Sequence, residues 1–315
     1  MKIILDKIEK APIICVFRHQ SPDPDALGSQ FGLVNWIKEN YPDKQVFAMG
    51  WHRGQSANLF GEYETVSDEV VRSSLAIILD TANKARIDDD RFALASDSIK
   101  IDHHPFTDQY AHYEYNDESA ASTSELICRL IRTKSEETLS TQTATYLYMG
   151  ILTDTLRFST QSTNANTLNC AAFLVNSHLN LSKINDDLFG METNEFLFSN
   201  YIRHHATIED NGLVYIKLDR DTLKRLNITA GQAKEKVNEL GLVRSFKIWA
   251  LFIEQEEDGS VHYNGSIRSR GLTVNDIAKR YNGGGHRLAA AVKQLDNTLL
   301  ESCINDLRLR IKGEL

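Results

Sequence analysis

The sequence predicts an α/β protein with a doubly wound, mostly parallel sheet, followed by a smaller α+β domain. In the first half, short continuous apolar runs alternate with segments of helical spacing, which is typical of a parallel sheet covered on both faces. In the second half, alternating strands and a tight turn signal replace that pattern. The 315 residues can form two cores. We expect a first domain over 1–185, a connector over 186–205 and a second domain over 206–315.

The first half contains apolar runs of strand length and amphipathic stretches between them. The predicted strands cover 12–17, 45–49, 75–79 and 99–101. The predicted helices cover 27–39, 120–132 and 141–152, where apolar residues recur every three or four positions. Because these runs are largely apolar and not alternating, we expect helices on both faces of their sheet.

The second half begins after a helical stretch, 181–205, which we interpret as the connector. The predicted strands there cover 213–218, 248–254 and 261–268, and Asp258-Gly259 is a hairpin turn signal between the last two. A helix over 274–281 ends at Asn282 and three glycines. This order indicates an α+β domain.

The net charge of −8 disfavours electrostatic binding of long nucleic acid. The acidic excess lies in the first 205 residues, with 18 Lys and Arg against 28 Asp and Glu; the remainder has 17 against 15. We therefore expect a small anionic partner that docks on the second domain and reaches acidic groups in the first.

No apolar run approaches the roughly 18 residues that span a bilayer, so no membrane association is expected. Charges near the N-terminus interrupt what would be the apolar core of a signal peptide, which predicts a cytoplasmic protein. The cysteines Cys15, Cys128, Cys170 and Cys303 form no CxxC pair and are expected to be buried free thiols.

Acids and histidines gather in four short segments. They are His19, Asp23, Asp25, Asp80, Asp102, His103, His104 and Asp154. Three of the segments follow predicted strands, and the carboxyl ends of parallel strands share one edge of a sheet. So many carboxylates at one place would repel each other, which predicts divalent cations between them.

Each acid also has an ordinary alternative role. Pro22 and Pro24 make the first segment an extended loop, so Asp23 and Asp25 can point the same way. Taken alone, Asp25 could cap the following helix, Asp23 could be a turn residue, and Asp80 could end a strand. The combination of four segments favours the metal site.

These segments resemble the motifs of the DHH phosphoesterase family. His19-x₃-Asp23-x-Asp25-Ala-Leu-Gly-Ser is similar to the first motif, Asp80 to the second, and Asp102-His103-His104 to the triplet that names the family. Asp154 matches the fourth motif. Gly283-Gly284-Gly285-His286 resembles the motif of the DHH-associated substrate domain, so the resemblance covers nearly the whole chain.

The resemblance implies two divalent metal ions, with manganese favoured. One ion would lie on His19, Asp23 and Asp80, and the other on Asp25, Asp80, His103 and Asp154. The catalytic residues would be Asp80, as the bridge between the ions, and His104, facing the phosphate, while Asp102 would orient a ring nitrogen. The metals would activate a water that attacks phosphorus.

Two segments of the second domain are expected to bind the substrate. They are Arg268-Ser269-Arg270, which ends a strand, and Gly283, Gly284, Gly285 and His286. Arginine guanidinium groups can form bidentate hydrogen bonds to phosphate, and the exposed backbone N–H groups of a glycine-rich turn can also bind it. A glycine-rich turn can, however, be purely structural. Arg287 stands where the family often carries proline. Together with the metals, these residues imply an active site in the interdomain cleft.

The resemblance implies degradation of short oligoribonucleotides to mononucleotides and dephosphorylation of 3′-phosphoadenosine-5′-phosphate to AMP. A phosphodiesterase of cyclic di-AMP turnover, acting on pApA or cyclic di-AMP, has the same motifs and stays open. An inorganic pyrophosphatase is disfavoured by the glycine motif, and a RecJ-like exonuclease by the chain length. A non-catalytic nucleotide sensor is the alternative from another class, and a homodimer is compatible with the sequence.

Other polar and aromatic groups are expected to be structural. The acidic run Asp88-Asp89-Asp90 is predicted to be a solvated face. Gly28-Ser29 could contact a phosphate at a helix start or serve close packing. Trp51 and Tyr281 could stack on a base, but core packing is the favoured role of both.

Overall fold

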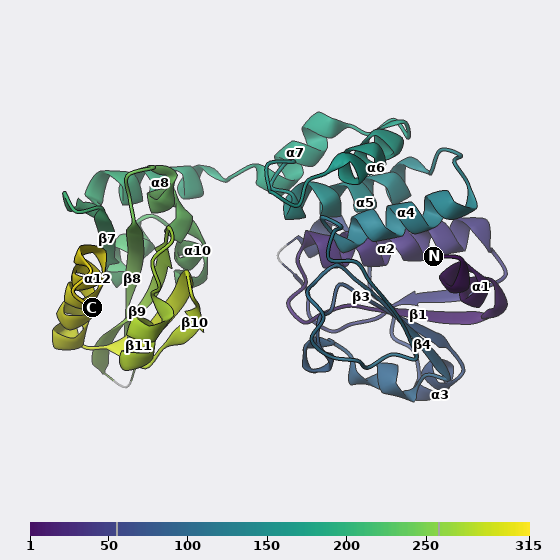
Figure 1. The fold of residues 1–315 in the computed structure, drawn as a ribbon, viewed down its shortest axis with the longest axis horizontal. Helices are drawn as coiled ribbons and strands as arrows, with labels where there is room; N and C mark the ends of the chain where they lie inside the picture. The colour runs from purple at the N-terminus through teal and green to yellow at the C-terminus, as the bar shows by residue number, and fades with distance from the viewer. Residues whose placement is uncertain (55, 258) are drawn as a thin grey trace. The chain divides into compact units, whose positions relative to one another are not determined.

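The computed structural model describes residues 1–54, 56–257 and 259–315. They form two compact units, Met1–Gly190 and Met191–Leu315, drawn in Figure 1. Each unit has a sheet of its own. Asp258, half of the predicted hairpin turn, lies outside the described residues.

The sheet of the first unit has the strand order β2-β1-β3-β4-β5, and each strand is parallel to the strands beside it. The strands are β1 (Ile13–Phe17), β2 (Gln45–Ala48), β3 (Leu75–Leu79), β4 (Asp97–Asp102) and β5 (Tyr113–Asn116). The predicted parallel sheet is confirmed. Strand β5 escaped prediction because its sequence, YEYN, is only half buried and contains no apolar run.

Alternate residues of the central strands belong to two separate hydrophobic cores, one on each face of the sheet. Ile14 and Val16 of β1 belong to the larger one, and Cys15 and Phe17 to the smaller one. Helices α2, α4 and α5 cover the face of the sheet that carries the larger core, and α3 lies on the opposite face (Figure 1). The helices of this unit are α1 (Lys2–Lys10), α2 (Pro24–Asn40), α3 (Asp68–Arg72), α4 (Thr123–Lys134), α5 (Thr141–Asp154), α6 (Ala165–Val175) and α7 (Leu181–Phe189). Short 3₁₀ segments are η1 (Ala57–Leu59), η2 (Lys84–Arg86) and η3 (Asp90–Leu94).

The second unit contains a mixed sheet in the order β10-β11-β9-β8-β7-β6, in which only the β7–β8 pair is parallel among the described strands. The strands are β6 (Thr207–Ile208), β7 (Leu213–Leu218), β8 (Ile248–Glu257), β9 (Ser260–Ser269), β10 (Gly284–His286) and β11 (Ala289–Leu295). The mixed sheet with flanking helices confirms the predicted α+β class.

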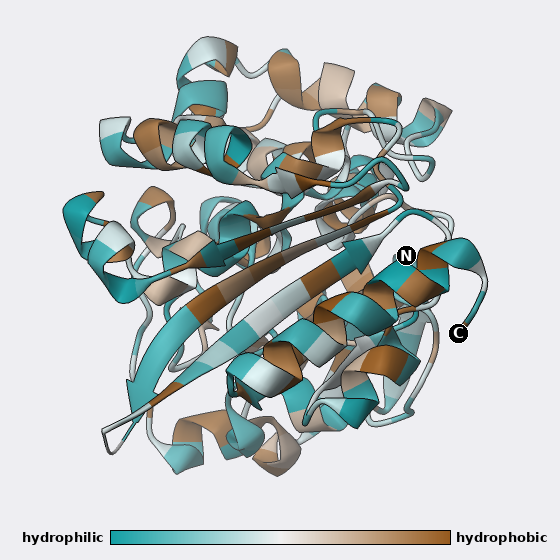
Figure 2. Cartoon of the chain, turned by 90° about the vertical axis from the view of Figure 1, so that its left-hand side faces the viewer, coloured by the Kyte–Doolittle hydropathy of each residue, from teal (hydrophilic) through white to brown (hydrophobic). Residues whose placement is uncertain are grey.

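Helices cover both faces of this second sheet. They are α8 (Thr193–His205), α9 (Arg220–Arg225), α10 (Ala230–Glu235), α11 (Asn275–Arg280) and α12 (Asn297–Lys312), with the 3₁₀ segment η4 (Lys236–Leu242). Helix α12 alternates hydrophilic and hydrophobic residues (Figure 2), and its Leu300 and Leu307 are buried. Helix α8 lies within the stretch predicted as a connector, and its Phe198 and Ile202 are buried in a core with β7 and β8.

Several expectations about single residues can be compared with the fold. All four cysteines are buried and free, as predicted. The solvated acidic run is wrong for Asp88 and Asp89, which are buried; only Asp90 is exposed. Tyr281 is buried as expected, whereas Trp51 is exposed. Among the residues that the structure describes, no helix combines the length and hydropathy needed to cross a bilayer.

Candidate metal centre and substrate surface

The carboxyl edge of the first sheet carries most of the predicted metal ligands. His19 and Asp23 lie in the loop after β1, and Asp25 lies in the first turn of α2. Asp80 follows β3, and His103 follows β4. Asp154 reaches the same place from the C-terminal end of α5. The topology thus brings together residues more than 130 positions apart.

Asp80 faces two groups of donors at once. Its Oδ2 lies 3.4 Å from His19 Nε2, which is also 3.7 Å from Asp23 Oδ2. Its Oδ1 lies 3.5 Å from His103 Nε2, which is 3.3 Å from Asp154 Oδ2 and 3.9 Å from Asp25 Oδ2. The donor atoms of each group lie within 4.8 Å of one another. The central position of Asp80 is the one that a bridging carboxylate requires.

The backbone of Asp80 is itself unusual. Its φ of 52° lies in the left-handed region, which residues other than glycine seldom adopt. Aspartate tolerates this conformation better than most residues do. Such conformations persist where the surrounding structure fixes them, and they cluster at functional sites. At Asp80 the turn directs the carboxylate towards both histidines.

The electrostatics of this cluster favour a cation. Burial and the neighbouring Asp80 and Asp154 raise the pKa of Asp25 well above its usual range. Burial, Asp80 and Asp23 raise the pKa of Asp154 to about 8. Burial opposes protonation of His19, but hydrogen bonds to Asp23 and Asp80 raise its pKa to about 10. Crowded carboxylates that would otherwise take up protons, combined with imidazole nitrogens, fit divalent transition metals.

The N-terminus of α4 holds two of the carboxylates in place. The backbone N–H groups of Thr123 and Ser124 donate to Asp25 over 2.7 and 2.9 Å. The Thr123 hydroxyl donates to Asp80 Oδ1 over 3.0 Å. Free N–H groups at a helix start attract carboxylates. Sequence reasoning missed these residues; the Ser-Thr-Ser-Glu start of α4 marks a helix N-terminus, but not what it faces.

Asp23 is both a candidate metal ligand and the N-cap of α2. Its Oδ1 accepts hydrogen bonds from the N–H groups of Asp25 and Ala26 over 3.1 and 3.0 Å. Its Oδ2 remains directed at His19. The cap of this helix is therefore Asp23, and the alternative role considered for Asp25 is not observed.

Asp102 and His104 form the second pair of the triplet. Asp102 Oδ1 lies 2.8 Å from His104 Nδ1 and accepts from the His104 backbone N–H over 3.2 Å. Burial would raise the pKa of Asp102, but the hydrogen bonds from His104 hold it below its usual range. The hydrogen bond to Asp102 raises the pKa of His104, although burial opposes it. This pairing directs Nε2 of His104 away from Asp102.

A buried lysine supports that pair. Lys100 is completely buried, and its Nζ lies 3.5 Å from Asp102 Oδ2 and donates to the carbonyl of Ala82 over 3.2 Å. A buried charge requires a partner of the opposite sign. The sequence carries a weak signal for it, namely a lysine between two isoleucines directly before the triplet.

Gly28 is close-packed. An added Cβ there would lie 2.4 Å from the carbonyl oxygen of Tyr146 on α5. Ser29 is fully buried. The packing role therefore explains this pair, and the contact with phosphate is not supported.

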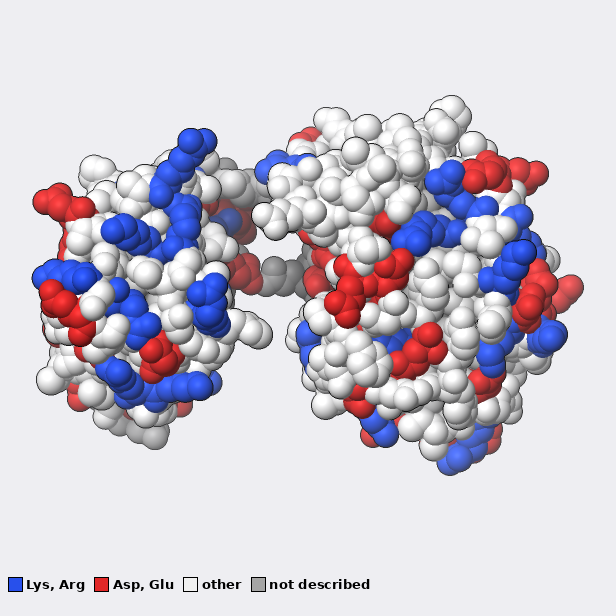
Figure 3. All heavy atoms as spheres, in the orientation of Figure 1, with Lys and Arg blue, Asp and Glu red and all other residues white. Residues whose placement is uncertain are grey.

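The two predicted substrate segments meet on the second sheet. Arg268 of β9 pairs with Ala289 of β11, which pairs with His286 of β10. The Arg268 guanidinium donates to the Ile267 carbonyl, and burial lowers its pKa; it has no ion pair with a described acid. Several lysine and arginine side chains lie on the visible face of the second unit, among uncharged residues and some acids (Figure 3).

Other members of these segments have roles within the fold. The Ser269 hydroxyl donates to the Leu272 carbonyl, and Arg270 donates to four carbonyls between Gly241 and Phe246. A Cβ at Gly283 would lie 1.9 Å from the Ala291 oxygen, and Gly285 has a φ of 133°. An added Cβ at Gly284 meets open space. Arg268, Gly284 and His286 are thus the members best placed to contact a ligand.

Comparison with known families matches both units. The model of the DHH family, N-terminal domain, matches residues 13–151, and that of the DHHA1 domain matches residues 210–313. The fold is similar to an exopolyphosphatase-related protein from Bacteroides fragilis, with a TM-score of 0.80 at 22% identity, covering 99% of this chain and 97% of that one.

Curated relatives are similar over nearly the whole chain. The bifunctional oligoribonuclease and PAP phosphatase NrnA of Bacillus subtilis is 35% identical and covers 88% of each chain. A probable NrnA of Streptococcus mutans is 35% identical over 99% of each chain. The cyclic-di-AMP phosphodiesterase GdpP of Geobacillus thermodenitrificans is 27% identical, and the match covers 94% of this chain and 46% of GdpP.

Proposed function

The chain belongs to the DHH family of phosphoesterases, and from this premise we propose that it degrades short oligoribonucleotides to mononucleotides. We also propose that it converts 3′-phosphoadenosine-5′-phosphate to AMP. The 35% identity to NrnA proteins over most of the chain supports both activities. The observation that carries the proposal is the position of Asp80, with one oxygen towards each donor group.

The donor groups define where two divalent ions, preferably manganese, would bind. His19, Asp23 and Asp80 would hold one ion, and Asp25, Asp80, His103 and Asp154 the other. Two such ions supply Lewis-acid stabilisation of a phosphoryl group and a nucleophilic water at neutral pH. Thr123 and Ser124 keep Asp25 and Asp80 directed at these positions.

His104 would donate a proton or a hydrogen bond to the phosphate. Asp102 holds its Nδ1 and favours the protonated ring, so Nε2–H is the free donor. A donor aimed at charge that develops on phosphate oxygens stabilises the transition state. Lys100 keeps Asp102 in place from the buried side.

The second unit would bind the nucleotide. Arg268 has no ion pair with any described acid and can offer a forked contact to phosphate. Gly284 lets a ligand approach the backbone closely. Substrate selection and chemistry would thus depend on different units.

A product-resolved assay of the purified protein with manganese tests this function. The substrates are a trinucleotide, pApA, 3′-phosphoadenosine-5′-phosphate and cyclic di-AMP, and chromatography separates the products. We expect AMP from 3′-phosphoadenosine-5′-phosphate and mononucleotides from the trinucleotide. Fastest turnover of cyclic di-AMP or pApA would instead favour the second candidate, a role in cyclic di-AMP turnover, which the GdpP similarity supports. Nucleotide binding without manganese-dependent products would indicate a sensor.

A further inference from the structure

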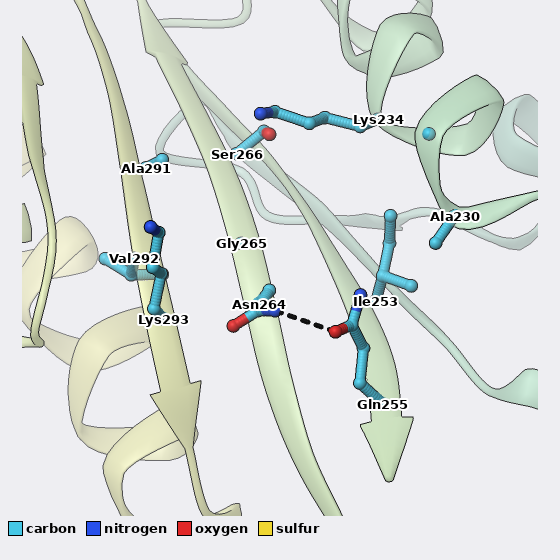
Figure 4. Close-up of a pocket in the computed structure, with 11 residues that line it drawn as sticks. Ala230, Lys234, Ile253, Gln255, Asn264, Gly265, Ser266, Ala291, Val292 and Lys293 are labelled. Atoms are coloured by element: carbon cyan, nitrogen blue, oxygen red, sulfur yellow. Dashed lines mark hydrogen bonds between the residues drawn. The ribbon is translucent and has the colours of Figure 1, made fainter. Parts of the chain in front are cut away.

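A hollow of about 270 Å³ opens on the same sheet face as Arg268. Side chains two apart on a strand share a face, so Ser266 and Asn264, which line the hollow, point with Arg268. Figure 4 shows the hollow between strands β8, β9 and β11 and helix α10. Ligand pockets usually measure about 300–1,000 Å³; this hollow lies just below that range, so it can take no more than one nucleotide unit.

Two lysines border the hollow without ion pairs to described acids. Lys234 extends from α10 and Lys293 from β11, on different sides of the hollow (Figure 4). By contrast, two other lysines of the unit have acidic partners: Lys217 pairs with Glu301, and Lys236 pairs with Glu195. Two cations that lack acidic partners at one concave surface attract an anion.

The lining between the lysines combines small apolar groups with amides. Ala230 and Ala291 contribute little bulk, and Ile253 adds apolar surface. The Asn264 amide donates to Gln255 Oε1 over 3.0 Å (Figure 4), which leaves the Gln255 amide N–H groups for a ligand. Apolar side chains beside amide groups match a nucleobase, which has apolar faces and forms hydrogen bonds at its edge.

The hollow is continuous with the proposed phosphate-binding surface. Ala291 pairs with Ser266 on one side and with Gly284 of the glycine segment on the other. Ser266 is two residues from Arg268, about 7 Å along the strand. A nucleotide held at Arg268 would therefore have its neighbour over the hollow.

We propose that this hollow binds a second nucleotide unit of a short oligoribonucleotide, with the base on its floor and phosphates towards Lys234 and Lys293. The inference rests on the proposed function and deepens it, because it names the feature that selects oligonucleotides. 3′-Phosphoadenosine-5′-phosphate has a single nucleoside and does not need the hollow.

The test compares the KM of the manganese-loaded enzyme for a trinucleotide and for 3′-phosphoadenosine-5′-phosphate. In the double variant Lys234→Ala/Lys293→Ala, we expect the trinucleotide KM to rise about tenfold, which corresponds to about 1.4 kcal/mol of binding. The KM for 3′-phosphoadenosine-5′-phosphate should stay within about twofold. Ala230→Leu narrows the hollow without changing charge and should act in the same direction. The control is Lys279→Ala, an exposed lysine of α11 outside the hollow.

An unchanged trinucleotide KM in both hollow variants, or equal rises for both substrates, would overturn the inference and leave the proposed function intact. A wild-type enzyme that hydrolysed neither substrate would overturn the proposed function, and the inference with it.

Discussion

The hydroxyl of Thr123 donates a hydrogen bond of 3.0 Å to Oδ1 of Asp80, across 43 residues of sequence. The backbone N–H of the same threonine holds Asp25. One residue at the start of α4 thus positions two carboxylates that face both donor groups. The geometry of the centre depends on this helix as well as on its ligands.

Thr123→Val should weaken metal binding by roughly 10–100-fold, because outer contacts of this kind orient the ligands. Valine has the same shape but cannot donate to Asp80. Titration calorimetry with Mn²⁺ measures the effect, and Thr123→Ser, which retains the hydroxyl, is the control. Equal affinity in the valine variant and the wild type would show that the hydrogen bond is dispensable.

Asp80→Ala should remove both metals and nearly all turnover, while the fold survives. Asp80 contributes to the raised pKa values of Asp25 and Asp154, so its removal relieves repulsion in the metal-free protein. We expect a metal-free Tm no lower than that of the wild type. Metal content by mass spectrometry, circular dichroism and activity are the measurements. Asp43→Ala, at an exposed acid, is the control; activity of Asp80→Ala near the wild-type level would contradict the assignment.

Asp88→Asn should destabilise the first unit by about 3 kcal/mol or more, since it breaks a buried ion pair with Arg18. Asp88 also accepts hydrogen bonds from the backbone N–H groups of Trp51 and His52. Urea unfolding at pH 7 measures the loss. Asp90→Asn, at the exposed end of the same acidic run, should have little effect.

The same pair predicts a pH dependence. Burial opposes ionisation of Asp88, but contacts with His52 and Arg18 lower its pKa below the usual 3.8. A carboxyl whose pKa is lowered by folding contributes stability above its unfolded pKa and loses it as pH falls through the folded value. We therefore expect the wild type to lose its advantage over Asp88→Asn below about pH 4. A constant difference from pH 7 to pH 3 would contradict this.

Arg268→Ala should raise the KM with a smaller change in kcat, because the residue is proposed to bind substrate and not to act on phosphorus. Arg270→Ala is an informative partner, since Arg270 bonds four carbonyls of its own unit. That variant should lower the Tm. An unchanged KM in Arg268→Ala would place the substrate surface elsewhere.

Local patterns predicted much of the fold. Strands β1 and β3 are apolar runs, so their sequence alone marks them as buried strands of a parallel sheet. Strand β5 lacks such a run, and its assignment depends on pairing with β4. The acidic run at Asp88 gave the wrong expectation because the partner that makes its burial favourable, Arg18, lies 70 residues earlier.

The sequence by itself determined the chemistry of the candidate centre: its imidazoles and carboxylates lie in four short segments. Three of these follow strands whose carboxyl ends share one edge of the parallel sheet, and Asp154 comes from the end of helix α5. Only the tertiary structure decided how the centre is held, because Thr123, Ser124 and Lys100 act on carboxylates through contacts that chain folding creates. It also decided where the second unit leaves a hollow between Lys234 and Lys293. Donor type is a property of a residue, whereas burial and distance are properties of everything packed around it.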